Sequence, residues 1–315
     1  MTHSFPPRGF QFTESDTYTF MEELGKGGHG NVFKIKNRSG RYYACKVFDS
    51  NILENESQYR KYLQESQIGI NIYHEHLVSF HKSVLIRESA AADATRHPAI
   101  IMDYVNGTDL ANFKKIYEFR FEKPFPRNYA ALLLAKACSG LEVLHRLNIQ
   151  HGDIKPGNVL ISETGYPKLT DYGIATFIGD TSISNELSGT IRYLAPEQII
   201  RVKDGGVSVD LRADIYSLGI VALELTAGLP GAMYSNPGRV LDFIVNGNDE
   251  LLKHLDNVDL APDLKFVIRS CLNRRMERRP SKVRELQNVL LHTIYGSHKG
   301  LTLEDIGDEM RRLMP

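Results

Sequence analysis

The residue pattern of the chain changes at Asn106-Gly107, and this change limits the folds that it can adopt. Before it, segments rich in β-branched and aromatic residues are separated by turn residues, which is typical of strands. These segments cover residues 18–24, 32–36, 41–48, 76–85 and 99–104, with one amphipathic helix predicted over 54–70. After Gly107, apolar residues recur at helical spacing at Ala130, Leu133, Leu134, Ala137, Leu141 and Leu144. We therefore expect an α+β fold with two unlike lobes, residues 18–105 and 106–293.

The two ends of the chain differ from these lobes. Residues 1–17 contain Pro, Ser and Thr without periodicity, which predicts a flexible N-terminal extension. Residues 294–315 form a C-terminal extension in which Thr302-Leu-Glu-Asp305 resembles a capping box. Leu303, Ile306, Met310 and Leu313 follow on one helical face, which predicts an amphipathic helix. Docking on the main body is favoured over binding to a partner.

Composition excludes several classes of protein. Lys plus Arg and Asp plus Glu number 38 each, so the formal net charge of zero argues against a nucleic-acid binder. The three cysteines have no CxxC spacing, and His74-Glu-His76 has no matching ligand cluster, which disfavours disulfides and metal sites. The most apolar stretch, residues 215–225, is too short to span a bilayer and contains Glu224. We expect a soluble, intracellular (cytoplasmic) protein without a membrane span; nothing indicates its oligomeric state.

A glycine cluster lies between the first two predicted strands. Gly25-Lys-Gly27-Gly-His-Gly30-Asn-Val32 fits the pattern G-x-G-x-x-G-x-V. A helix would follow such a loop in a dinucleotide-binding fold, whereas here a strand follows. This context favours a β-hairpin whose backbone N–H groups face phosphate oxygens. Strand alternation places Ala44 and Lys46 on one face, and a lysine on an inward face needs an anionic partner.

The most informative segment is His151-Gly-Asp153-Ile-Lys155-Pro-Gly-Asn158. Asp171-Tyr-Gly173, Gly189-Thr190, Ala195-Pro-Glu197, Asp214 and Arg278-Arg-Pro280 follow it. Together with the glycine loop and Lys46, these motifs resemble a eukaryotic-type Ser/Thr protein kinase catalytic domain over about residues 18–293. The resemblance implies the two-lobed protein kinase fold, with a small, mainly β N-lobe and a larger, mainly α C-lobe. It also implies ATP and Mg²⁺ as cofactors and protein substrates with Ser or Thr acceptors.

The resemblance implies a role for each matching residue. Lys46 would hold the α- and β-phosphates and pair with Glu65, Asp153 would orient the substrate hydroxyl, and Lys155 would steady the γ-phosphate. Asn158 and Asp171 would bind Mg²⁺. Leu24, Val32, Ala44 and Leu160 would sandwich the adenine beside the gatekeeper Met102. The full nucleotide-binding set is Leu24, Gly25, Gly27, Gly30, Val32, Ala44, Lys46, Met102, Asp103, Val105, Asp109, Asn158, Leu160 and Asp171, in which Asp109 could reach the ribose.

Further positions resemble structural residues of the family. Thr190 lies where the Ser/Thr group hydrogen-bonds the catalytic Asp and Lys. Glu197 and Arg279 resemble a pair that ties the substrate-side loop to the last helices. Asp214 resembles the residue that braces the backbone around His151.

Two positions depart from the family pattern. Gly152 replaces the arginine that grips a phosphate on the activation loop, so we hypothesise a non-RD kinase whose activity does not require phosphorylation of that loop. Gly69 replaces a bulky apolar residue, which predicts weaker packing of the helix that carries Glu65. A one-residue shift, with Ile68 or Ile70 in this place, is the alternative.

Two other classes compete with an active Ser/Thr protein kinase. A nucleotide-binding pseudokinase scaffold would lack one or more of Lys46, Asp153, Asn158 and Asp171, but all four are present. A kinase-fold phosphotransferase for small molecules usually lacks the Ala-Pro-Glu loop, which is present as Ala195–Glu197. An active protein kinase is therefore the favoured hypothesis.

Overall fold

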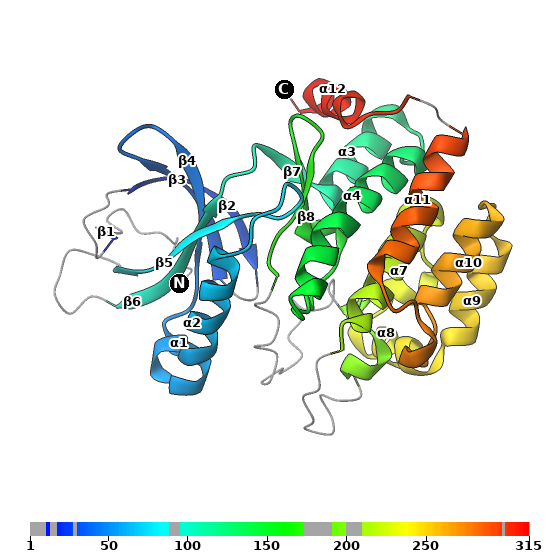
Figure 1. Cartoon of the computed structure of the whole chain (residues 1–315), viewed down its shortest axis with the longest axis horizontal. Helices are drawn as coiled ribbons and strands as arrows, with labels where there is room; N and C mark the ends of the chain where they lie inside the picture. Colours follow the sequence, from blue (N-terminus) through cyan, green and yellow to red (C-terminus); the bar gives the residue numbers. More distant parts are fainter. Residues whose placement is uncertain are drawn as a thin grey trace. The chain divides into compact units, whose positions relative to one another are not determined.

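The chain folds into two compact units, one rich in strands and one rich in helices. The computed structural model describes residues 11–12, 18–27, 30–87, 95–172, 191–199, 210–297 and 300–314. The first unit comprises Met1–His74 and Val78–Val105, and the second comprises Glu75–Leu77 and Asn106–Pro315. Glu75–Leu77, which the expected lobe of residues 18–105 includes, belong to the second unit. The α+β fold is confirmed, with blue to cyan strands in one unit and green to red helices in the other (Figure 1).

A six-stranded antiparallel sheet with the order β1-β5-β6-β4-β3-β2 forms the first unit. Its elements are β1 (Gln11–Phe12), β2 (Tyr18–Gly27), β3 (Gly30–Asn37), β4 (Tyr42–Val47), α1 (Asn51–Glu54), α2 (Glu56–Ile70), β5 (Phe80–Arg87) and β6 (Arg96–Asp103). The expected strand over residues 76–85 begins only at Phe80, and the expected helix over 54–70 is interrupted at Asn55. Gln11 and Phe12, in the predicted flexible extension, pair with Ile86 and Arg87 of β5.

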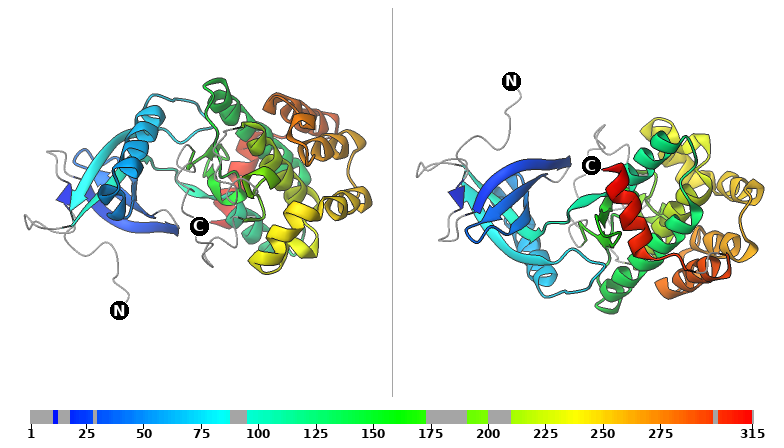
Figure 2. Two further views of the ribbon diagram at one scale, coloured as in Figure 1. Left: turned by 90° about the horizontal axis from the view of Figure 1, so that it is seen from below. Right: turned by 90° about the horizontal axis from the view of Figure 1, so that it is seen from above.

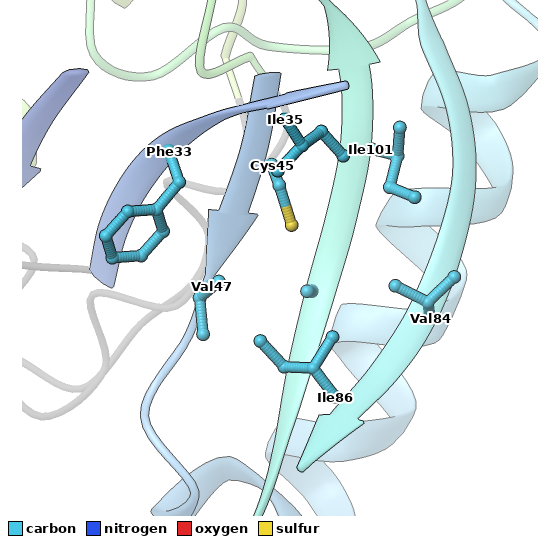
Figure 3. Close-up of a cluster of buried hydrophobic side chains, with 8 residues drawn as sticks. Phe33, Ile35, Cys45, Val47, Val84, Ile86 and Ile101 are labelled. Atoms are coloured by element: carbon cyan, nitrogen blue, oxygen red, sulfur yellow. The ribbon is translucent and has the colours of Figure 1, made fainter. Parts of the chain in front are cut away.

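One face of the sheet of the first unit carries a cluster of buried apolar side chains. Figure 3 shows side chains of β3, β4, β5 and β6 that converge in a single cluster. The cluster consists of Phe33, Ile35, Cys45, Val47, Val84, Ile86, Ala99 and Ile101. Because neighbouring residues of a strand point to opposite faces, the alternate residues Ala44 and Lys46 lie on the other face, as the sequence predicts. Burial raises the pKa of the Cys45 thiol to about 12, which makes it a packing residue.

Gly69 of α2 is matched by a large side chain on β5. A Cβ atom at Gly69 would overlap the Phe80 ring, whose residue is only 1% exposed. The ring therefore occupies the space that the side chain of a bulkier helix residue would fill. The prediction that Gly69 weakens the packing of this helix is wrong at this position, because the missing volume is supplied from the neighbouring strand.

The second unit contains a short three-stranded sheet and a helical body. Its elements are β7 (Gly107–Asp109), α3 (Leu110–Phe121), α4 (Arg127–Arg146), β8 (Val159–Ser162), β9 (Pro167–Leu169), α7 (Arg212–Ala227), α8 (Pro237–Asn246), α9 (Asn248–Asn257), α10 (Pro262–Cys271), α11 (Val283–Ser297) and α12 (Leu303–Leu313). The predicted apolar stripe of α4 is buried. In residues 215–225 of α7, every residue except Glu224 is buried, which explains their apolar composition.

The C-terminal extension is partly helical. Residues 294–297 belong to α11, and α12 begins after the Thr302–Asp305 capping box that the sequence predicts. Leu303, Ile306 and Met310 are buried against the second unit. The predicted docking of this amphipathic helix on the main body is therefore confirmed.

Candidate active site

Lys46 lies on the sheet face opposite the apolar cluster. It pairs with Val32 of β3 and Ile100 of β6, while Ala44, two residues earlier on the same strand, pairs with Met102. Lys46 is only 5% exposed, and its ammonium group lies 5.6 Å from the centre of the Phe48 ring. The sheet thus presents a buried cation beside Val32 and Ala44, two of the residues predicted to contact the adenine. A buried lysine is costly unless an anion balances it.

The glycines of the β2–β3 hairpin differ in whether the structure requires glycine at their positions. Gly30 has a φ of 131°, and a Cβ there would overlap the backbone carbonyl of Val47. Only glycine fits that conformation and that approach. A Cβ at Gly25 would meet no atom within 4 Å, so packing does not require a glycine at this position. Gly27 is the last residue of β2, where it pairs with Gly30.

Asp153, Lys155 and Asn158 are joined by hydrogen bonds in one loop of the second unit. The Lys155 ammonium donates to Asp153 Oδ2 at 2.8 Å. Asn158 Nδ2 donates to the same oxygen at 2.8 Å and to the Asp153 backbone carbonyl at 2.7 Å. Charge-assisted contacts of this kind hold a carboxylate in a defined orientation. Oδ2 of Asp153 is therefore held by two donors.

Asp214 of α7 holds the backbone that leads into Asp153. Its carboxylate, which is 1% exposed, accepts hydrogen bonds from the backbone N–H groups of His151 and Gly152, both at 2.8 Å. This is the bracing role that the resemblance implies for Asp214. Nε2 of His145 also lies 2.9 Å from Asp214 Oδ2. The sequence does not reveal this third contact, because His145 and Asp214 are 69 positions apart.

His151 is buried next to this brace. Burial lowers the pKa of its imidazole, and the nearby carboxylate of Asp214 only partly opposes this effect. Nδ1 accepts from the Asp153 N–H at 3.4 Å, which places the proton of the neutral ring on Nε2. The ring lies edge-on to Tyr172, with the ring centres 6.4 Å apart. A neutral imidazole in this place supports the loop without adding charge to it.

The β8–β9 hairpin brings Asn158 close to the segment that contains Asp171. Val159 pairs with Leu169, and the Thr170 N–H donates to the Asn158 carbonyl at 3.0 Å. Asp171, the next residue, has a φ of 61°, a left-handed conformation that aspartate tolerates better than most residues.

Asn158 and Asp171 could supply oxygen ligands for a hard cation. Because both hydrogen bonds of Asn158 Nδ2 go to Asp153, the Asn158 Oδ1 atom is left as an oxygen ligand. Together with the Asp171 carboxylate it suits Mg²⁺, which prefers oxygen ligands and keeps several waters. No group of three or more His, Cys, Asp and Glu residues suited to a metal exists within the described residues.

Glu197 and Arg279 form the predicted ion pair. Arg279 donates to both carboxylate oxygens of Glu197, at 2.6 and 2.7 Å, across 82 positions of sequence. The guanidinium also donates to the backbone carbonyls of Asn273 and Arg212 and lies 4.9 Å from the Tyr216 ring centre. Its side chain is 0% exposed. This buried pair fixes the segment around residue 197 against the helices that follow α7.

Several other predicted nucleotide contacts have structural partners of their own. Asp109 is the N-cap of α3, where Oδ1 accepts from the Asn112 N–H at 2.9 Å. Asp103 Oδ1 lies 2.8 Å from His81 Nε2, while the Asp103 N–H donates to the Ser79 carbonyl at 2.9 Å. Leu160 pairs with Asp109 and Lys168 in the small sheet. Leu24 is 43% exposed, and Met102 is buried in β6.

Some predicted residues lie outside the described part of the chain. They are the residues of the predicted activation loop from Gly173 to Thr190. Glu65 lies in α2, but its side chain is also outside the described set. Its pairing with Lys46 and the contacts of Thr190 therefore remain predictions.

Comparison with known proteins identifies the family. The protein kinase domain matches residues 18–293 of this chain. Serine/threonine-protein kinase PknB of Mycobacterium leprae is 31% identical over 286 residues, which cover 90% of this chain and 44% of PknB. MAP3K epsilon protein kinase 1 of Arabidopsis thaliana is 30% identical over 277 residues, which cover 86% of this chain and 19% of that protein. The chain thus spans less than half the length of these curated relatives.

A solved structure agrees with the fold. The crystal structure of the Mycobacterium tuberculosis PknI kinase domain matches with a TM-score of 0.61 at 21% sequence identity, covering 90% of this chain and 97% of that one. This likeness supports the fold, and the match to residues 18–293 covers most of the sequence, including the Asp153 loop and the β8–β9 hairpin. The chain belongs to the protein kinase family.

Proposed function

We propose that this chain transfers the γ-phosphoryl group of ATP to serine and threonine hydroxyls of protein substrates. The observation that carries the proposal is the hydrogen-bonded set of Asp153, Lys155 and Asn158, braced through Asp214. The relatives named serine/threonine-protein kinase support the choice of acceptor. Because phosphoryl transfer depends on positioning and charge neutralisation, a rigid set of oppositely charged groups is suited to it.

Asp153 would orient the acceptor hydroxyl and take its proton at a carboxylate oxygen. Lys155, whose ammonium now contacts Asp153 Oδ2, would steady the charge of the transferred group. The braced backbone at His151 and Gly152 keeps Asp153 in place during this step. The hydrogen bonds of the loop and the family to which the chain belongs support these proposed roles.

Asn158 and Asp171 would hold magnesium. Bound Mg²⁺ neutralises phosphate charge. The contribution of this chain is the orientation of Asn158 Oδ1 through its amide nitrogen and the placement of Asp171 at the end of the β8–β9 hairpin. Lys46 would bind the α- and β-phosphates and pair with Glu65, and the remaining predicted contacts from Leu24 to Leu160 would hold the nucleotide.

The decisive experiment compares Asp153→Asn with the wild-type chain. The substitution preserves shape but removes the proton acceptor, so transfer to a protein substrate should fall by about 10²-fold or more. Asp263→Asn, at an exposed position of α10, is the matched control and should transfer phosphate normally. Phosphoamino acid analysis of the product should show phosphoserine and phosphothreonine. Transfer by Asp153→Asn within a factor of a few of wild type would contradict the mechanism, and phosphotyrosine alone would contradict the specificity.

We further propose that activity does not depend on phosphorylation of the activation loop. Gly152 provides no cation for a loop phosphate, and its N–H already donates to Asp214. A chain with alanine at Thr176, Thr181, Ser182, Ser184 and Ser188 should retain turnover within a factor of a few. A loss of several orders of magnitude would show that a loop phosphate is required.

A further inference from the structure

The C-terminal helix α12 packs closely against the turn between β8 and β9. Gly165 in this turn has a φ of 83°, and a Cβ there would overlap the backbone of Leu303. On the other side, a Cβ at Gly307 of α12 would lie 2.6 Å from the Thr164 carbonyl carbon. Arg311 donates to the Glu163 carbonyl at 2.6 Å. Two glycines thus allow close backbone contact, which gives the last turn of α12 a defined place.

Helix α12 lies outside the residues that match the family and forms a groove with α3. Contacts join α12 to both α3 and α4, and Figure 1 shows it lying across them. Seen from above in Figure 2, α12 lies along the surface of the second unit. The groove has a volume of about 520 Å³, and its lining includes Lys115, Ile116, Phe119, Arg120, Arg312 and Leu313 together with Asn112. We call it the basic groove.

The basic groove combines apolar surface with positive charge. Phe119 is 85% exposed, so its ring is accessible to an occupant of the groove. None of the lining residues is acidic. Among the described residues, no carboxylate forms an ion pair with Lys115 or Arg120, whereas Glu309 lies 3.7 Å from Arg312. The Arg312 side chain remains 75% exposed in that contact.

This combination specifies the chemistry of an occupant. Three cations attract carboxylates, and the exposed Phe119 with Ile116 and Leu313 offers a contact for one large apolar side chain. Because the α12 backbone is already held against the β8–β9 turn, binding avoids the cost of ordering this helix. We propose that the basic groove docks an acidic segment of a partner protein that carries a large apolar residue. This inference does not rest on the proposed phosphoryl transfer, since binding can be measured without ATP.

The test is binding of a fluorescein-labelled octapeptide, Asp-Glu-Asp-Leu-Glu-Asp-Glu-Asp, followed by fluorescence anisotropy. The wild-type chain should bind it at least about tenfold more tightly than the same peptide with Lys in place of each acid, and less tightly as salt is raised. Replacement of its leucine by serine should weaken binding. The double variant Lys115→Glu with Arg120→Glu should lose at least about tenfold in affinity, and Phe119→Ser should reproduce the effect of removing the leucine.

Matched controls separate docking from general charge. The double variant Lys253→Glu with Arg284→Glu changes two exposed cations on α9 and α11 and should bind the peptide as the wild type does. Thermal unfolding of each variant identifies any that is misfolded; for such a variant, alanine at the same positions replaces the charge reversal. Equal binding of the acidic and lysine peptides would overturn the proposal. A second result would also overturn it: the wild-type chain binds anionic phosphatidylserine vesicles but not the peptide, and the groove variants lose this vesicle binding. The surface would then recognise lipid.

Discussion

The carboxylate of Asp214 offers a direct test of how this chain positions its catalytic loop. It is buried and lies within hydrogen-bond distance of three groups: the N–H groups of His151 and Gly152 and the His145 ring. Asp214→Asn is nearly isosteric but retains one acceptor oxygen. If that oxygen takes the place of Oδ2, the contacts with His151 and His145 survive, and the Gly152 N–H faces an amide NH₂ group instead of an acceptor.

The expected loss of stability follows from the number of hydrogen bonds that each substitution removes. One hydrogen bond to a charged group is worth about 1.5–3 kcal/mol, and a buried N–H without an acceptor adds a desolvation cost, so the free energy of unfolding should fall by about 2–4 kcal/mol. Asp214→Ala would lose all three contacts, a cost that approaches the total stability of about 5–15 kcal/mol typical of a domain. Asparagine is therefore the informative replacement. Because Gly152 directly precedes Asp153, a small displacement should also reduce kcat by about 10- to 100-fold.

Urea unfolding and steady-state phosphorylation of a protein substrate measure the two effects. Thr226→Val is the matched control on the same helix, because the buried Thr226 hydroxyl donates only within α7, to the Ala222 carbonyl at 2.6 Å. It should cost about 1 kcal/mol and leave kcat unchanged. If Asp214→Asn unfolds within about 0.5 kcal/mol of the wild type and keeps its kcat, the bracing role assigned to this carboxylate is refuted.

Three further predictions follow from buried contacts. Gly69→Leu should lower the unfolding free energy by about 1–3 kcal/mol through overlap with Phe80, and the second substitution Phe80→Ala should recover part of the loss in urea unfolding; additive losses would contradict the complementarity. Arg279→Lys should cost about 3–5 kcal/mol, because lysine cannot make the two-pronged contact with Glu197, and unchanged stability would refute this. Burial lowers the pKa of His151 below its usual 6.5, so the unfolded state binds a proton more readily than the folded state does. The free energy of unfolding is therefore highest above about pH 6.5, and it falls as the pH drops toward the folded-state pKa. His151→Gln should reduce this slope in unfolding measured between pH 5 and 7, and an identical slope would contradict the cause.

Much of the fold could be predicted because local patterns determine it. The strand alternation that separates Lys46 from Cys45 and the helical stripe of α4 both depend on residues close in sequence. The Thr302–Asp305 capping box is likewise a local arrangement and was predictable. The first and last residues of individual strands and helices were harder to predict. Phe80 begins its strand several residues later than expected, because residues 75–77 belong to the second unit, where Leu77 pairs with Leu169.

The candidate site, too, could be predicted in part from the sequence. The order and spacing of the motifs around Asp153, Asn158 and Asp171 indicate the chemistry, because the residue types that handle phosphate and magnesium are few. The structural partners of individual residues could not be predicted from the sequence. The Phe80 ring fills the space beside Gly69, and Asp109, which is predicted to reach the ribose, also caps α3.

The sequence alone thus determined the two kinds of lobe and the apolar stripe of α4, and it indicates the groups that we propose to handle phosphate. Only the tertiary structure decided which residues far apart in the sequence come into contact. It brought His145 to Asp214, set Gly307 against the turn at Gly165, and formed the basic groove from α3 and α12. The physical reason is that such contacts depend on the paths of two backbones at once, and steric fit between distant segments leaves no periodic pattern in the chain.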